Sequence, residues 1–125
     1  MPEAPLVAVV DDEAAIRDSV DMFLSGLGYR VLTFESAEAL LGNIPSGHPV
    51  CLLLDVRMPR MSGFELVDEL QRRGINWPIA LMTGHGADVA RAFAESSAAD
   101  IEVFAKPVSS KDVEQFVARS LAGVT

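Results

Sequence analysis

Four short, largely apolar runs of this 125-residue chain end in side chains that can hold ions or phosphate, and this pattern limits the fold most. The runs are LVAVV before Asp11 and Asp12, VCLLL before Asp55, PIALM before Thr83-Gly84, and IEVFA before Lys106-Pro107. Nearly continuous apolar runs of this length are typical of parallel strands that are buried on both faces. Because parallel strands end at one edge of the sheet, where open α/β sheets bind ligands, we expect these side chains to lie together.

Amphipathic segments separate the apolar runs, so the sequence predicts five strand–helix units. The expected strands cover residues 6–10, 29–34, 50–54, 78–82 and 101–105. The expected helices are one closed by Gly28, a short one capped by Ser36, one ending near Gly74, one over 87–96, and one that Ser110 opens. Such units predict a parallel sheet covered on both faces, with right-handed crossovers. No linker or repeat interrupts them, so we predict one domain over residues 1–125.

Composition restricts the partners and the compartment. The formal net charge is −8, which disfavours contact with DNA or anionic membranes and favours cations and protein partners. The single cysteine, Cys51, lies inside an apolar run, so we expect no disulfide and a reducing cytoplasm. No signal sequence opens the chain and no apolar run approaches the roughly 20 residues of a membrane span. We therefore expect a soluble domain without membrane contact.

The three aspartates favour a magnesium site. Mg²⁺ prefers oxygen ligands and is bound through one or two carboxylates plus waters and phosphate oxygens. Two like charges about 4 Å apart cost roughly 4 kcal/mol at an effective dielectric of about 20. A cluster of Asp11, Asp12 and Asp55 therefore implies a bound cation or a raised carboxyl pKa. Taken alone, Asp11 and Asp12 could instead serve only to cap the following helix.

The same edge carries groups that suit phosphoryl transfer. Asp55 is the candidate nucleophile, because a carboxylate can attack phosphorus to form an acyl phosphate. Lys106 would neutralise charge on the phosphoryl oxygens, while the hydroxyl of Thr83 and the backbone N–H of Gly84 could bond to them. The simpler interpretations are a solvated surface lysine and a threonine that only stabilises a turn.

The motifs VVDDE, LLLDVRMPRMSG, LMTGHG and FAKP, in this order, resemble the receiver domain of bacterial two-component response regulators, and their wording is similar to the FixJ-like branch. The resemblance covers essentially the whole chain. It implies a flavodoxin-like (βα)5 three-layer sandwich with a five-stranded parallel sheet of order 2-1-3-4-5. It also implies specific roles for the site residues. Asp55 would be the phosphoacceptor. The Mg²⁺ ligands would be Asp12, Asp55, the carbonyl of Arg57 and, more often through water, Asp11. Thr83 would supply the switch hydroxyl, Lys106 would sense the phosphate, and Pro107 would follow a cis bond.

Receiver domains take phosphoryl from a sensor histidine kinase or a small donor and supply their own groups for transfer and hydrolysis, so the resemblance implies a signalling switch and not an enzyme acting on other substrates. Phosphorylation then changes the surface of the fourth helix, fifth strand and fifth helix, which binds a partner. Homodimerisation through this surface is one expectation, although Val89, Phe93 and Phe116 could instead face the core. FixJ-like receivers commonly precede a DNA-binding domain, so the chain could be a stand-alone receiver or the front of a longer regulator. We assign no DNA contact to these residues.

The sequence departs from the family pattern in its last third. The switch aromatic usually stands three residues before the lysine, which is Val103 here, whereas Phe104 comes one residue later. Because side chains alternate along a strand, this places the ring on the opposite face unless a bulge restores it. We favour signalling without the aromatic coupling. The segment from Thr83 to Lys106 is also one residue longer than in FixJ-like relatives, so we expect a short, mobile or displaced fourth helix.

Arg57 and His85 stand two residues after Asp55 and Thr83, positions that flank the path of the hydrolytic water in this family. A long arginine there would obstruct the water or pair with phosphoryl oxygen, so we expect slow autodephosphorylation. The simpler interpretation is an exposed arginine paired with a nearby acid, and a chemical role for His85 is the weaker hypothesis. His48, in the loop over residues 45–49, is expected to be solvated.

Two other functions fit parts of the pattern. A magnesium-dependent phosphohydrolase with an Asp nucleophile generally needs a second acid two residues later, but Arg57 stands there and a cap domain is missing. A receiver-like module that no longer accepts phosphate fits the altered fifth strand but not the intact site residues. Incubation with Mg²⁺ and acetyl phosphate or beryllofluoride separates these three functions.

Overall fold

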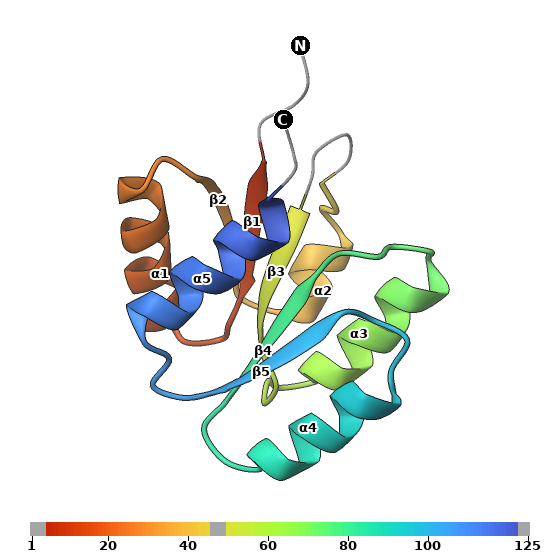
Figure 1. The fold of residues 1–125 in the computed structure, drawn as a ribbon. Helices are drawn as coiled ribbons and strands as arrows, with labels where there is room; N and C mark the ends of the chain where they lie inside the picture. Colours follow the sequence, from red (N-terminus) through yellow and green to blue (C-terminus); the bar gives the residue numbers. More distant parts are fainter. Residues whose placement is uncertain (1–4, 46–49, 123–125) are drawn as a thin grey trace.

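The structure, a computed structural model, describes residues 5–45 and 50–122 as a single sheet with helices on both faces (Figure 1). The strands are β1 (Leu6–Val10), β2 (Arg30–Phe34), β3 (Val50–Asp55), β4 (Ile79–Thr83) and β5 (Ile101–Ala105). The helices are α1 (Ala14–Gly26), α2 (Ala37–Leu41), α3 (Gly63–Arg72), α4 (Ala87–Ser96) and α5 (Ser110–Leu121). The expected loop with His48 lies outside the described residues, apart from Pro45.

All strand pairs are parallel and follow the order β2-β1-β3-β4-β5. Helices α1 and α5 cover one face of the sheet, and α2, α3 and α4 cover the other (Figure 1). Because side chains alternate along a strand, each face has its own core. Leu52 and Leu54 pack in the core beneath α2 and α3, whereas Val7 and Leu53 pack in the core beneath α1 and α5. The predicted three-layer fold and strand order are confirmed.

Burial differs between the centre and the edges of the sheet. Every residue of β1, β3 and β4 is buried, as their unbroken apolar sequences predict. The edge strands β2 and β5 contain no fully buried residue. The two strands that carry acids at their carboxyl ends, β1 and β3, are therefore held on both faces and by neighbours on both sides.

Local signals set the helix boundaries. The hydroxyl of Ser36 accepts a hydrogen bond from the backbone N–H of Ala39 at 3.0 Å, as expected for a cap of α2. Helix α1 ends at Gly26, and Gly28 follows with a φ of 95°, which glycine adopts without strain. Strands β3 and β4 each extend one residue further than predicted, so Asp55 and Thr83 are their last residues.

Helix α4 has the ten residues predicted for it, the same number as α3, so the expectation of a short helix is wrong. The alternatives of a mobile or displaced helix stay predictions. In the described part of the chain, the helices are all too short or too polar to cross a lipid bilayer.

Candidate functional site: an acidic pocket at the carboxyl edge of the sheet

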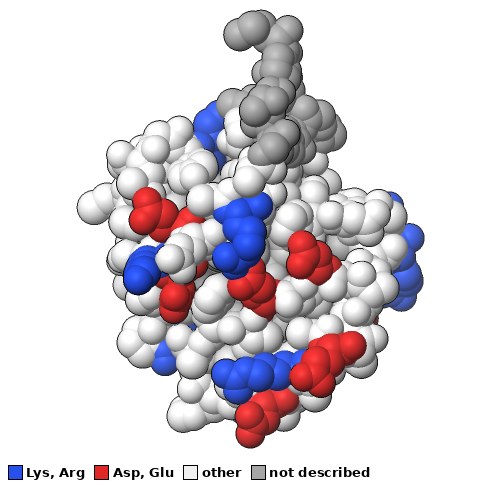
Figure 2. All heavy atoms as spheres, viewed as in Figure 1, with Lys and Arg blue, Asp and Glu red and all other residues white. Residues whose placement is uncertain are grey.

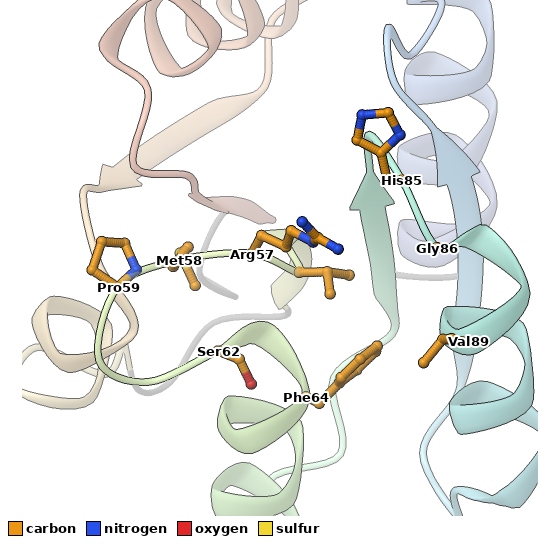
Figure 3. A pocket seen from close by; sticks show the side chains of 9 residues that line it. Arg57, Met58, Pro59, Ser62, Phe64, His85, Gly86 and Val89 are labelled. Carbon is orange, nitrogen blue, oxygen red and sulfur yellow. The ribbon is translucent and has the colours of Figure 1, made fainter.

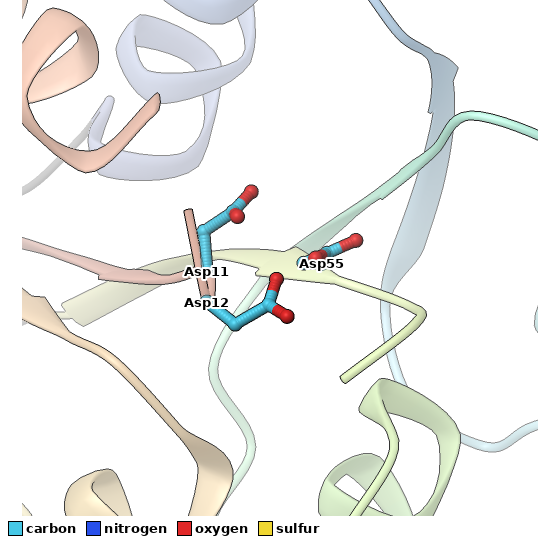
Figure 4. Close-up of side chains that lie close together, drawn as sticks. All are labelled: Asp11, Asp12 and Asp55. Carbon is cyan, nitrogen blue, oxygen red and sulfur yellow. The ribbon is translucent and has the colours of Figure 1, made fainter. Parts of the chain in front are cut away.

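The carboxylates of Asp11, Asp12 and Asp55 lie close together at the ends of β1 and β3 (Figure 4). One oxygen from each lies within 4.8 Å of those from the other two. Asp11 is 0% exposed and Asp55 is 4% exposed, whereas Asp12 is open to solvent. Both buried carboxylates accept from backbone amides two residues later: Asp11 from Glu13 at 2.9 Å and Asp55 from Arg57 at 3.4 Å. The predicted convergence of the three acids is present.

Lys106 brings the cation into the same pocket from the end of β5. Its Nζ lies 3.1 Å from an oxygen of Asp11 and 3.3 Å from an oxygen of Asp55. The lysine side chain is only 17% exposed, so these pairs are shielded from solvent. The interpretation of Lys106 as a solvated surface lysine is therefore wrong. The peptide bond between Lys106 and Pro107 is cis, as expected.

Burial and charge change the acidity of the pocket. Burial, followed by repulsion from Asp11, raises the pKa of Asp55 from 3.8 to about 6, against the opposing effect of Lys106. Partial burial acts to lower the pKa of Lys106, but its hydrogen bond with Asp11 and the charges of Asp11 and Asp55 outweigh this and raise it. The carboxylates thus hold the lysine charged, and Asp55 carries a cost for being ionised.

Thr83 ends β4 and is buried, with 2% of its surface exposed. Its hydroxyl donates a hydrogen bond to the backbone carbonyl of His85, and its own carbonyl accepts from the backbone N–H of Lys106 at 2.8 Å. The hydroxyl therefore has a partner in the loop between β4 and α4. Gly84, which follows, lines a hollow of about 360 Å³ that also contains Asp12, Asp55 and Lys106.

Arg57 and His85 line the same hollow, at its rim between the loop after β3 and the loop after β4. Both residues are exposed. Both therefore lie beside Asp55, the predicted phosphoacceptor. The effect of Arg57 on hydrolysis and the use of its carbonyl as a metal ligand stay predictions.

Val103 and Phe104 lie on opposite faces of β5. The pairing of β4 with β5 is regular, with Leu81 opposite Val103 and Met82 opposite Phe104, so no bulge restores the aromatic position. Val103 packs toward the core under α3 and α4, whereas Phe104 packs against Phe116 of α5 with ring centroids 6.4 Å apart. The ring of Phe104 is therefore on the far side of the sheet from α4, as alternation predicts.

Three further residues shape the site and were not identified from the sequence. Glu13 places an oxygen 3.7 Å from Nζ of Lys106, and Arg17 of α1 donates a hydrogen bond to the carbonyl of Asp11 at 2.8 Å. Gly63 begins α3 so close to β3 that an added Cβ would lie 2.4 Å from the carbonyl oxygen of Asp55. Glu13 adjoins the Asp pair in sequence, and Arg17 follows one helical turn later, which are weak signals for both residues. The close approach of Gly63 to β3 depends on how the helix packs, and no feature of the sequence indicated it.

The donor set fits a magnesium ion. The three carboxylates supply hard oxygen ligands at one place, and Lys106 already balances part of their charge. Burial, and then repulsion from Asp11, keep the pKa of Asp55 raised in spite of Lys106. A divalent cation would supply the missing positive charge.

Comparison with known proteins places the chain beside response regulators. Residues 7–118 match the family model described as "Response regulator receiver domain". The chain is 37% identical over 101 residues to the transcriptional regulatory protein FixJ of Bradyrhizobium diazoefficiens, covering 81% of this chain and 49% of that protein. It is 35% identical over 108 residues to the response regulator protein TmoT of Ectopseudomonas mendocina, covering 86% and 49%. The chain spans about half the length of these curated relatives.

Solved structures agree with the sequence matches. The crystal structure of FixJ-N superposes with a TM-score of 0.84 at 32% identity and covers 98% of both chains. The BeF3-activated DrrB receiver domain superposes with a TM-score of 0.79 at 29% identity and covers 95% of this chain and 98% of that one.

Proposed function

Because this chain belongs to the response regulator receiver domain family, we propose that it is a switch whose phosphoacceptor is Asp55. Receiver domains of response regulators act in phosphorylation-dependent two-component signalling and are phosphorylated by histidine kinases. The single observation that carries the assignment to Asp55 is its place at the end of the central strand β3, beside two further carboxylates and 3.3 Å from the ammonium of Lys106.

In the proposed reaction, a carboxylate oxygen of Asp55 forms a bond to the phosphorus of a phosphohistidine as the P–N bond breaks and its electron pair returns to the imidazole. Lys106 neutralises charge on the transferred group, and Thr83 and the N–H of Gly84 offer hydrogen bonds to its oxygens. Asp11, Asp12, Asp55 and the carbonyl of Arg57 would hold Mg²⁺, which supplies charge neutralisation when bound. The chemistry is limited to this self-modification and its hydrolysis.

The output of the proposed switch is the surface formed by α4, β5 and α5. One feature supports the proposal: α4 adjoins the loop that accepts the hydrogen bond of Thr83. Homodimerisation is one proposed use of the surface; Val89 is 62% exposed but lies on the side of α4 that faces Phe64. Phe116 is 2% exposed and belongs to the core, and Phe93 is half-buried against Phe64, so neither is a free contact residue.

No nucleic-acid or membrane contact is proposed for these residues. Among the described residues on the face in Figure 2, basic and acidic side chains are interspersed. This mixed charge and the net charge of −8 favour protein partners over polyanions.

Incubation with acetyl phosphate and Mg²⁺, followed by intact-protein mass spectrometry, tests the proposal. We expect the mass of one phosphoryl group on the parent, none on Asp55→Asn and none with EDTA. Asp68→Asn, which removes an exposed acid of α3, is the matched control and should be labelled like the parent. Labelling of Asp55→Asn at the parental level would contradict the assignment, and sustained turnover of phosphate esters would favour a hydrolase.

The predicted obstruction by Arg57 is measured by the loss of phosphate after the donor is removed. We expect Arg57→Ala to lose phosphate several-fold faster than the parent, because the hydrolytic water gains access to the phosphorus. Arg60→Ala, in the same loop but outside the hollow around Asp55, is the control. An equal rate in the parent and Arg57→Ala would exclude the side chain of Arg57 from the control of hydrolysis.

A further inference from the structure

A second hollow lies next to the acidic pocket, between the loop after β3 and the first turn of α4 (Figure 3). Its volume is about 550 Å³, within the roughly 300–1,000 Å³ typical of small-molecule sites. It is lined by Val56, Arg57, Met58, Pro59, Ser62, Phe64, His85, Gly86 and Val89. The proposed phosphotransfer uses none of its apolar residues.

Apolar side chains form most of this second hollow. Phe64 of α3 forms an aromatic wall of the hollow. Its ring packs against that of Phe93 of α4, with ring centroids 4.5 Å apart, and this contact restricts its movement. Val89 lies opposite the loop after β3 and leaves most of its side chain open to solvent (Figure 3). A ligand that buried this surface would gain roughly 25 cal/mol for each Å² of apolar area removed from water.

The charged side chains that line the second hollow are basic, whereas the protein as a whole has a negative net charge. The chain carries 18 acidic and 10 basic residues, yet the residues that line this hollow include no acid. Arg57 supplies a permanent cation with several N–H donors, and His85 supplies an imidazole. Both lie toward one side of the hollow, the imidazole of His85 pointing away from its centre, and Phe64 and Val89 lie on the other side (Figure 3).

We propose that this second hollow binds a small amphipathic organic anion, whose ring or alkyl body packs against Phe64 and Val89 and whose carboxylate or sulfonate is bound by Arg57 and His85. Guanidinium groups bind planar anions through paired N–H bonds. The separation of the apolar wall from the two basic side chains matches a molecule with one apolar and one anionic end.

The second hollow shares Arg57 and His85 with the acidic pocket around Asp55. An anion bound in one therefore competes for the same donors with a phosphoryl group bound in the other. This consequence rests on the proposed function, whereas binding of the anion to the unmodified protein does not. Linkage requires the effect to be reciprocal, and coupling between two sites is commonly about 5–150-fold.

The binding test uses 8-anilinonaphthalene-1-sulfonate, an aromatic sulfonate, and the uncharged N-phenyl-1-naphthylamine, both titrated by fluorescence into the unmodified protein. We expect saturable binding of the sulfonate at one site. Arg57→Ala should weaken the sulfonate about tenfold and leave the neutral amine nearly unchanged. Val89→Glu, a change at an exposed position, should weaken both probes. Met22→Glu is the matched control, because Met22 is 78% exposed on α1, far from α4 in the fold (Figure 1).

Absence of saturable binding to the parent would overturn the proposal, as would equal losses in Val89→Glu and Met22→Glu. Equal weakening of the two probes by Arg57→Ala would overturn the assignment of the anion to Arg57.

The coupling is tested by repeating the sulfonate titration with Mg²⁺ and beryllofluoride, which we expect to weaken the sulfonate at least about fivefold in the parent and not in Asp55→Asn. An unchanged affinity in a parent that mass spectrometry shows to accept phosphate would overturn the coupling. Failure of the parent to accept phosphate would instead overturn the proposed function and leave the binding result standing.

Discussion

Helices α3 and α4 contain ten residues each and cover the same face of the sheet, but they are attached to it differently. Helix α3 begins with a capping box formed by Ser62 and Glu65 and buries four residues, whereas α4 begins after Gly86 without a side-chain cap and buries only Ala90. The caps and buried residues that α4 lacks are each worth of the order of 1 kcal/mol or more.

This difference in attachment suggests different roles for the two helices. The start of α3 at Gly63 packs directly against the end of the strand that carries Asp55, so this contact holds the backbone of Asp55 in place. Helix α4 follows the loop that holds the hydroxyl of Thr83 and contributes little to the core. A rearrangement of α4 is therefore expected to cost less free energy than one of α3, which suits the proposed role of α4 in a surface that changes on phosphorylation.

The largest expected effect comes from breaking the attachment of α3. The Cβ of Gly63→Ala would lie 2.4 Å from the carbonyl oxygen of Asp55 and 3.0 Å from the Cα of Val56, so backbone must move. We expect a loss of about 3–4 kcal/mol in the free energy of unfolding and weakened binding of beryllofluoride, both measured by denaturant titration with and without the ligand.

Gly26→Ala is the control for Gly63→Ala, because an added Cβ at Gly26 meets no atom within 4 Å. Gly26 ends α1, where alanine should stabilise by up to about 1 kcal/mol. Equal effects of the two substitutions would show that α3 is not held against β3 as described.

The next largest effect concerns the charge of Asp55, at the end of β3 beside α3. The pKa of Asp55 is raised from 3.8 to about 6, so the folded protein carries a cost for ionising it. This cost is absent below about pH 3.8 and complete above about pH 6, where it reaches about 3 kcal/mol. In EDTA, the stability of Asp55→Asn relative to the parent should therefore rise by about 2–3 kcal/mol between pH 4 and pH 7.5.

Denaturant titrations of the two proteins at several pH values measure this change, with the surface substitution Asp68→Asn as the control for removing an acid. A relative stability of Asp55→Asn that falls as pH rises would mean that Lys106 stabilises the carboxylate more than burial destabilises it.

A third test compares the same substitution on the two faces of the sheet, beside α4 and beneath α1 and α5. Val103 lines an open hollow of about 300 Å³ between β5 and α4, whereas Val9 of β1 is 0% exposed beneath α1 and α5. Val9→Phe should cost about 1–3 kcal/mol through overpacking, and Val103→Phe less than about 1 kcal/mol, both measured by thermal unfolding. A cost for Val103→Phe as large as that for Val9→Phe would show that α4 is packed as firmly as α1 and α5.

The smallest effect is expected in the loop between β3 and α3. Arg60 has a φ of 68°, which an arginine rarely adopts, and its ion pair with Glu38 is solvent-exposed at 3.5 Å. Asn tolerates this conformation better, so Arg60→Asn should stabilise by about 0.5–1 kcal/mol in denaturant titrations. Arg72→Asn, in the last turn of α3, is the control for the loss of an exposed arginine. A destabilised Arg60→Asn would show that the pair with Glu38 outweighs the backbone strain.

The sequence alone predicts most of the central structure, because short unbroken apolar runs such as VCLLL are typical of strands buried on both faces. Once β1, β3 and β5 run parallel in one sheet, their carboxyl ends share one edge, and Asp11, Asp55 and Lys106 are expected at that edge. The alternation of side chains likewise places Val103 and Phe104 on opposite faces.

What the sequence does not predict depends on packing distances and side-chain orientation. The close approach of Gly63 to Asp55 arises from how α3 sits on β3, and the same residue could have been a simple turn glycine. The hydroxyl of Thr83 could donate to several acceptors, and the path of the following loop determines that the acceptor is the backbone carbonyl of His85. Strand ends at Asp55 and Thr83 differ by one residue from the prediction, because their backbone groups still bond to neighbouring strands after the apolar run has stopped.

The hydrogen bond from Thr83 to the carbonyl of His85 has a simple arithmetic consequence. A hydroxyl has one hydrogen, so it cannot be given at once to the loop and to an oxygen atom attached at Asp55. Whichever acceptor takes the hydrogen, the other is left to find water or a new donor. If Asp55 carries a phosphoryl group as proposed, this competition would tie the backbone before α4 to the chemical state of a residue on a different strand.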